Sequence, residues 1–132
     1  MVGADPNRLL KVVLIEDSSF LCQALGDVLD ELSDVQVVGQ AEDERSAIEL
    51  LQRQQPHLAI VDLQLRTGSG FGVLRALRGN PGRFGSPRAV VFSSHGEASV
   101  RERCFALGVE RFFDKTSQVG ELLAYVRQAI PS

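Results

Sequence analysis

Five short apolar runs, each followed by a stretch with helical periodicity, constrain the fold of this chain most. The runs cover residues 11–15, 35–38, 58–61, 88–92 and 109–113. Most of them contain consecutive Val, Ile or Leu residues rather than alternating polar ones, which is typical of strands buried on both faces. Buried strands that alternate with helices predict an α/β domain in which helices cover both faces of a parallel sheet.

The segments between the apolar runs predict the helices and loops. Ser18 or Ser19 is expected to cap the first helix, and the breaker-rich segment 79–87 is expected to be a surface loop. Gly108 predicts a left-handed residue at the end of the fourth helix. The first helix is expected to turn its apolar stripe toward the core, namely Phe20, Leu21, Ala24, Leu25, Val28, Leu29 and Leu32.

Length, composition and charge narrow the class of protein. A chain of 132 residues with 44% hydrophobic residues is enough for one core, and we expect one domain over residues 9–132 after a flexible arm at 1–8. The net charge of −3 comes from interspersed charges, which argues against a nucleic-acid-binding face. Cys22 and Cys104 match no metal-ligand spacing, and neither a signal peptide nor a membrane-length run occurs. These features predict a cytoplasmic protein that binds no membrane.

Four of the five predicted strands are followed by side chains of related chemistry. These are the Glu16-Asp17 pair, Asp62, Ser93 and Lys115. If the strand order is 2-1-3-4-5, strands 1 and 3 are neighbours and a crevice opens above their carboxyl ends. Two like charges ~5 Å apart cost about 3 kcal/mol at an effective dielectric constant of ~20, so the crowded carboxylates require a cation or a raised pKa. An all-oxygen ligand set is typical of Mg²⁺.

A metal ion, an ammonium group and a hydroxyl around one carboxylate form a receptor for a phosphoryl group. Asp62 is the candidate nucleophile, as in enzymes that form an aspartyl phosphate. Lys115 and the metal ion would neutralise charge on the transferred group, and Ser93 would supply the hydroxyl. Each residue also has an ordinary alternative, since Asp62 and Ser93 could cap helices and Lys115 could be a solvated surface residue.

Together these residues resemble the response-regulator receiver domain of two-component systems. Asp62 and Ser93 are thirty-one residues apart, and Lys115 follows twenty-two residues later. This resemblance implies a (βα)5 flavodoxin-like fold, doubly wound around a parallel sheet of strand order 2-1-3-4-5. The motifs that carry it are Val13-Leu14-Ile15-Glu16-Asp17, Ile60-Val61-Asp62, Gly70, Val91-Phe92-Ser93 and Phe112-Phe113-Asp114-Lys115.

By resemblance, Asp62 is the phosphoacceptor and the neighbouring oxygens form a Mg²⁺ site. Asp17 and Asp62 would bind the ion directly. The backbone carbonyl of Gln64 would complete the site, and Glu16 would assist through water.

Other positions resemble those through which receiver domains respond to the phosphoryl group. Ser93 and Lys115 would bind it, and Phe112 falls at the aromatic switch position. Gln64 and His95 are candidates for tuning its lifetime, although a loop histidine is often simply exposed.

Arg66 departs from the family pattern, because a proline usually occupies this position. The replacement gives the loop after Asp62 one more backbone donor and one less restraint. The sequence alone offers no interpretation of Arg66.

The resemblance predicts that Asp62 receives a phosphoryl group from the phosphohistidine of a histidine kinase or histidine phosphotransfer protein. Phosphorylation would then switch a protein-interaction surface. The chain is not expected to be an enzyme beyond Mg²⁺-dependent self-phosphorylation and slow autodephosphorylation. Because the sequence ends soon after the last predicted helix, we expect a stand-alone domain that acts through an unidentified downstream protein.

Two alternatives are less favoured. A receiver-like interaction module that is not phosphorylated would usually lack one of the acidic, serine or lysine residues, and all are present here. A Mg²⁺-dependent phosphohydrolase with Asp62 as nucleophile would carry a second aspartate where this chain has Gln64.

Overall fold

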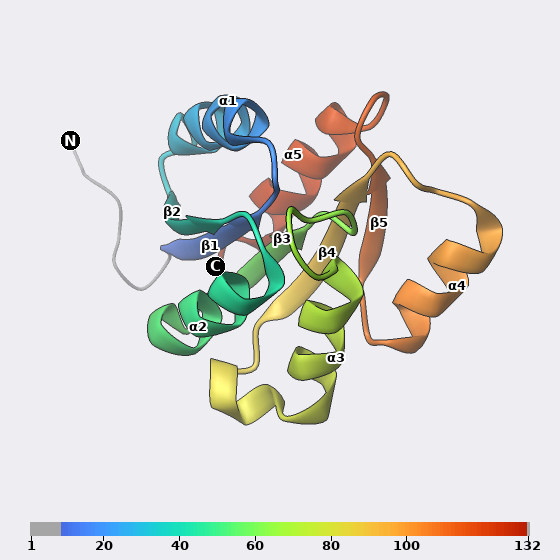
Figure 1. Ribbon diagram of the computed structural model, residues 1–132. Coiled ribbons are helices and arrows are strands. Elements are labelled where there is room, and N and C mark those ends of the chain that lie inside the picture. The colour runs from blue at the N-terminus through green and yellow to red at the C-terminus, as the bar shows by residue number, and fades with distance from the viewer. Residues whose placement is uncertain (1–8, 132) are drawn as a thin grey trace.

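The computed structural model describes residues 9–131 as a parallel sheet with helices on both sides (Figure 1). The expected N-terminal arm, residues 1–8, lies outside the described residues. The strands are β1 (Leu10–Ile15), β2 (Val35–Ala41), β3 (Leu58–Val61), β4 (Arg88–Ser93) and β5 (Arg111–Asp114). The helices are α1 (Ser19–Asp30), α2 (Glu44–Gln54), α3 (Gly70–Gly79), α4 (Ala98–Ala106) and α5 (Val119–Ala129), with a 3₁₀ helix, η2, at Pro81–Phe84.

The sheet has the strand order β2-β1-β3-β4-β5, and all its pairings are parallel. The predicted doubly wound topology is therefore confirmed. Ile15 of β1 pairs with Val61 of β3, and Ser93 of β4 pairs with Asp114 of β5. This register brings the residues that follow β1, β3 and β5 to the same edge of the sheet.

Alternation along the strands divides the core between the two faces of the sheet. Val13 and Ile15 belong to the cluster under α2, α3 and α4, whereas Val12 and Leu14 belong to the cluster under α1 and α5. Successive side chains of a strand point to opposite faces, so a strand covered on both sides needs apolar residues at every position. This requirement explains why the apolar runs of the sequence are continuous.

Helix α1 turns only part of its predicted apolar stripe toward the core, where Leu25, Leu29 and Leu32 pack. Phe20 is 79% exposed and Val28 is 38% exposed, whereas Cys22 and Leu29 are buried. The buried residues of α1 include Gly26, so the inner face follows the spacing i, i+4, i+7 from Cys22. The expected cap is confirmed at Ser18, whose Oγ accepts a hydrogen bond from the Leu21 N–H at 3.2 Å.

One strand boundary and one loop prediction are corrected in part. The second strand continues through Gly39 to Ala41, because the missing side chain of Gly39 leaves room for Leu50; a Cβ there would lie 2.7 Å from Leu50 Cδ1. The segment 79–87 contains η2 and buries Phe84 completely, so it is not wholly a surface loop. Gly108 has the predicted left-handed conformation, with φ of 90°.

No helix within residues 9–131 is long and apolar enough to span a bilayer.

Candidate functional site

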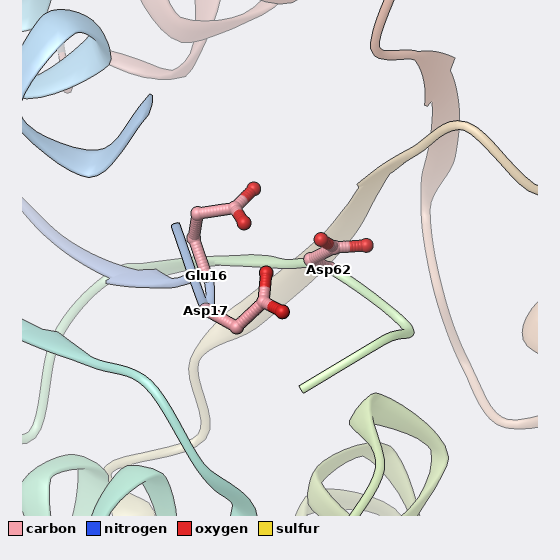
Figure 2. A group of neighbouring side chains, drawn as sticks. All are labelled: Glu16, Asp17 and Asp62. Atoms are coloured by element: carbon pink, nitrogen blue, oxygen red, sulfur yellow. The ribbon is translucent and has the colours of Figure 1, made fainter. Parts of the chain in front are cut away.

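Three carboxylates gather where β1 and β3 end. One oxygen each from Glu16, Asp17 and Asp62 lies within 4.8 Å of the others, and Figure 2 shows the three side chains gathered at the ends of the two strands. The Asp62 N–H donates to the Ile15 carbonyl at 2.8 Å, which extends the β1–β3 pairing to the site itself. Asp62 is 4% exposed and Glu16 is 8% exposed, so their charges are poorly screened by water.

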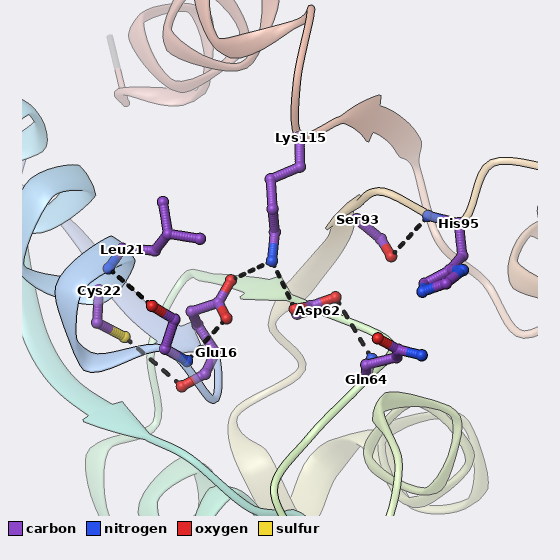
Figure 3. Close-up of polar contacts among 9 residues, drawn as sticks. Glu16, Leu21, Cys22, Asp62, Gln64, Ser93, His95 and Lys115 are labelled. Atoms are coloured by element: carbon purple, nitrogen blue, oxygen red, sulfur yellow. Dashed lines mark hydrogen bonds and ion pairs between the residues drawn. The ribbon is translucent and has the colours of Figure 1, made fainter.

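Lys115 supplies the positive charge between two of these carboxylates. Its Nζ lies 2.6 Å from Glu16 Oε1 and 2.7 Å from Asp62 Oδ2, and the side chain reaches the site from the end of β5 (Figure 3). The Lys115 N–H donates to the Ser93 carbonyl at 3.1 Å, which fixes the start of this approach. Burial works to lower the pKa of Lys115, but the contacts with Asp62 and Glu16 outweigh it and raise the pKa.

Glu16 is the carboxyl group whose protonation the site changes most clearly. Burial raises the pKa of Glu16 to about 7, against the opposing effects of Lys115 and of the Ser18 N–H. That N–H donates to Glu16 Oε2 at 3.0 Å. The nearby Asp17 and Asp62 raise the pKa further.

The donor set fits Mg²⁺. Carboxylate oxygens that are close enough to share one ion are the ligands that this cation prefers. The residues that would hold the ion are Asp17 and Asp62, with Glu16 beside them. The cation would add to the positive charge that Lys115 already provides.

The raised pKa of Glu16 gives a first prediction. A carboxyl group with a pKa of about 7 holds its proton at lower pH, and Mg²⁺ binding must then displace that proton. Mg²⁺ affinity should therefore increase as the pH rises from about 6 to about 8, by up to about tenfold. Isothermal titration calorimetry at the two pH values measures this change. Glu16→Gln should remove most of the pH dependence, and an equal affinity at both values in the unaltered protein would contradict the prediction.

Ser93 and the two candidates for tuning the phosphoryl lifetime, Gln64 and His95, lie around Asp62 (Figure 3). Ser93 is fully buried, and its Oγ accepts a hydrogen bond from the His95 N–H at 3.3 Å (Figure 3). The Gln64 N–H donates to Asp62 Oδ1 at 3.3 Å. Gln64 is exposed and His95 is half-buried, so both positions are within the rim of the site rather than its floor.

Phe112 lies beside a residue that the sequence did not single out. Phe112 is 6% exposed, and the Arg101 guanidinium lies 4.5 Å from the centre of its ring. Arg101 Nε also donates to the Gly96 carbonyl at 3.0 Å. Arg101 thus joins α4, β5 and the β4–α4 loop. The sequence holds no local signal for this contact, because it depends on how α4 packs beside β5.

Comparison with known families identifies the family to which this fold belongs. Residues 12–127 match the family described as the response regulator receiver domain. The chain belongs to this family. Receiver domains generally bind Mg²⁺ at an acidic cluster, and they take phosphoryl groups from histidine kinases or phosphotransfer proteins.

Among curated proteins, this receiver domain is similar to part of two larger bacterial proteins. It is 33% identical over 133 residues to protein-glutamate methylesterase/protein-glutamine glutaminase 5 of Myxococcus xanthus, covering 91% of this chain and 36% of the relative. It is 31% identical to the protein of that name from Moorella thermoacetica, covering 92% of this chain and 28% of the relative. The chain thus spans about a third of the length of these relatives.

Solved structures agree with this assignment. The response regulator domain of Thermotoga maritima CheB matches with a TM-score of 0.82 and 25% identity, covering 92% of this chain and 96% of that domain. The receiver domain of Klebsiella pneumoniae RstA matches with a TM-score of 0.80 and 24% identity, covering 92% and 99% of the two chains. The second likeness concerns the fold alone.

Proposed function

We propose that this receiver domain accepts a phosphoryl group on Asp62 from a phosphohistidine in a two-component phosphorelay. The observation that carries the proposal is the position of Lys115, whose ammonium group contacts both Asp62 and Glu16. Asp62 is a buried carboxylate that contacts this ammonium group and lies beside two further carboxylates, Glu16 and Asp17. This arrangement places a carboxylate nucleophile beside groups that can neutralise the negative charge of a phosphoryl group.

The proposed transfer moves phosphorus from a nitrogen to an oxygen atom. A carboxylate oxygen of Asp62 forms a bond to phosphorus, while the P–N bond of the phosphohistidine breaks and its electron pair remains on the imidazole. Lys115 stabilises charge on the transferred group, and the Ser93 hydroxyl is the proposed donor to a phosphoryl oxygen. Bound Mg²⁺ would further neutralise the charge that develops on these oxygens.

The proposed donor is a histidine kinase or histidine phosphotransfer protein that docks over α1 and α5. A cavity of about 170 Å³ is lined by Glu16, Asp62 and Lys115, by apolar side chains of α1 and of strands β1, β3 and β4, and by Val119 of α5. Phe20 of α1 is 79% exposed, and Val119 of α5 is 41% exposed. An exposed apolar surface beside the nucleophile suits a protein phosphodonor better than a small molecule.

We further propose a cytoplasmic signalling role without ester hydrolysis by this chain. The curated relatives are methylesterases, but the similarity covers about a third of their length and coincides with the receiver family match. The chemistry proposed here is self-phosphorylation and slow autodephosphorylation. The net charge of −3 supports a protein rather than a nucleic acid as the downstream partner.

The test is to incubate the protein with acetyl phosphate, with Mg²⁺ or with EDTA, and to measure its intact mass. We expect one phosphoryl group per chain, stable in acid and labile in base, only when Mg²⁺ is present. Peptide mapping should place it on Asp62. No addition would contradict the proposal and favour a non-phosphorylated interaction module. Multiple turnover on phosphomonoesters would instead indicate a phosphohydrolase.

Phosphorylation is proposed to change the surface formed by α4, β5 and α5. Ser93 would move toward the phosphoryl oxygens, and the Phe112 ring would turn inward into the space that Ser93 leaves. Arg101 supports a link between Ser93 and Phe112. It lies over the Phe112 ring and also contacts Gly96 in the loop that follows Ser93. Movement of this loop would shift the group that covers the Phe112 ring.

Arg101→Ala is therefore expected to alter the response of Phe112 without preventing phosphorylation. Loss of a cation–π contact of about 1 kcal/mol would increase ring mobility. NMR signals of ring-labelled Phe112, recorded with and without acetyl phosphate, measure this response. Arg103→Ala is the matched control, because Arg103 lies on the same helix and stacks on Phe71 at 4.0 Å. Equal behaviour of Phe112 in both variants would contradict the proposed link.

A further inference from the structure

The loop between β3 and α3 is attached to the loop between β2 and α2. The Arg66 N–H donates to the Glu42 carbonyl at 3.0 Å, and the Glu44 N–H donates to the Thr67 carbonyl at 3.0 Å. The Arg66 and Glu42 side chains also form an ion pair at 3.3 Å. Backbone bonds in both directions resemble a short piece of sheet between two loops. The first loop carries Gln64, so its position matters to the proposed Mg²⁺ site.

The side chain of Glu44 adds a third connection. Glu44 Oε1 accepts a hydrogen bond from the Ser69 N–H at 2.9 Å. Ser69 is paired with Gln64 by an isolated antiparallel bridge, and the Gln64 N–H contacts Asp62 Oδ1 at 3.3 Å. A short path thus connects Glu44, through Ser69 and Gln64, to the nucleophile.

Two glycines leave the space that the Glu44 side chain occupies. A Cβ at Gly72 would overlap the Glu44 carboxyl group, and one at Gly68 would lie 2.5 Å from Glu44 Cβ. Gly68 also has a φ of 78°, which favours glycine. Gly72 is buried and lies within α3. The placement of Glu44 is therefore built into residues of the other loop and helix.

These contacts give Arg66 a structural role. A proline at this position would lack the N–H that Arg66 donates to Glu42. Arg66 therefore replaces the restraint of a proline ring with a hydrogen bond and an ion pair to the neighbouring loop.

We infer that Glu44 is a positioning residue, which holds the β3–α3 loop so that Gln64 is placed for Mg²⁺ binding beside Asp62. The inference rests on the proposed function, because it concerns the same metal site. Glu44 acts on the proposed Mg²⁺ site through Ser69 and Gln64. Groups that orient a metal-binding segment commonly change metal affinity by about tenfold or more when they are removed.

The test compares Mg²⁺ affinity among variants of the full chain by calorimetry. Glu44→Ala should weaken Mg²⁺ binding by about tenfold, whereas Glu44→Gln, which keeps an acceptor oxygen, should lose less. Glu49→Ala is the matched control, because Glu49 lies on the same helix in an exposed pair with Arg45. Hydrogen exchange of the Ser69 amide should become faster in Glu44→Ala but not in Glu49→Ala.

A kinetic comparison separates positioning from general loss of structure. With acetyl phosphate, Glu44→Ala should need about tenfold more Mg²⁺ for half-maximal phosphorylation but approach the unaltered rate at saturating Mg²⁺. Gly72→Ala should mimic this shift by displacing the carboxyl group, and adding Glu44→Ala to it should have little further effect.

The outcomes distinguish the inference from the proposed function. If the unaltered protein binds Mg²⁺ and is phosphorylated while Glu44→Ala keeps the same Mg²⁺ affinity, the inference alone is wrong. If the unaltered protein neither binds Mg²⁺ nor is phosphorylated, the proposed function and the inference both fail. A proportional fall in rate at every Mg²⁺ concentration would also overturn the positioning role.

Discussion

Asp62→Asn is expected to abolish phosphorylation by acetyl phosphate and by any phosphohistidine donor. Asparagine keeps the shape of the side chain and an oxygen that can accept hydrogen bonds, but it is neutral and cannot form the acyl phosphate. Lys115 and the Gln64 N–H contact the two Asp62 oxygens at 2.7 and 3.3 Å, and the single oxygen of asparagine can keep one of these two contacts. Intact-mass measurement should show no added phosphoryl group even after prolonged incubation at high Mg²⁺ concentration.

Asp17→Asn separates loss of the nucleophile from loss of the metal ion. Asp17 belongs to the same cluster of carboxylates as Asp62. The ion pairs of Lys115 are with Glu16 and Asp62, so they do not depend on Asp17. This variant should bind Mg²⁺ more weakly, by about tenfold or more, yet still acquire the phosphoryl group at high Mg²⁺. Full phosphorylation of Asp62→Asn would show that another residue is the acceptor.

The sequence predicted that these side chains lie together, because topology determines most of their placement. Parallel strands place their carboxyl ends at one edge of the sheet, so Asp62 and Lys115 had to lie near each other once the strand order was known. The pairing of Ile15 with Val61 then brings Glu16 and Asp17 beside Asp62. These contacts follow from the positions of the strands, which hydrophobic patterns predict, and from their order, which the resemblance to receiver domains implies.

The contacts that the sequence did not predict depend on how two segments pack against each other. The hydrophobic pattern of one segment does not specify that packing. The apolar stripe of α1 included Phe20, but the rotation of the helix leaves Phe20 79% exposed. The contacts of Arg66 with Glu42 and of Arg101 with Phe112 likewise join segments distant in the chain. The role of such a side chain depends on the position of both segments that it joins.

Gly70→Ala is expected to be the most destabilising of the glycine substitutions around the site. A Cβ at Gly70 would overlap the Asp62 carbonyl oxygen and lie 2.8 Å from Leu63 Cα. Both are backbone atoms, so no side chain can rotate away to make room. The Gly70 N–H also donates to the Leu63 carbonyl at 3.0 Å, which holds the start of α3 against this segment. We expect the free energy of unfolding to fall by about 1–3 kcal/mol or more.

Gly120→Ala tests whether close packing, rather than the loss of glycine, causes this effect. Gly120 also lies in the first turn of a helix, α5, but a Cβ there would meet nothing within 4 Å. Alanine is the better helix former, so this variant should be unchanged or more stable by up to about 1 kcal/mol. Urea denaturation followed by circular dichroism measures both variants. Because the Gly70 shift would displace the backbone at Asp62, Gly70→Ala should also be phosphorylated more slowly under conditions in which it is folded. Equal stability of the two variants would mean that α3 lies farther from the end of β3 than these distances indicate.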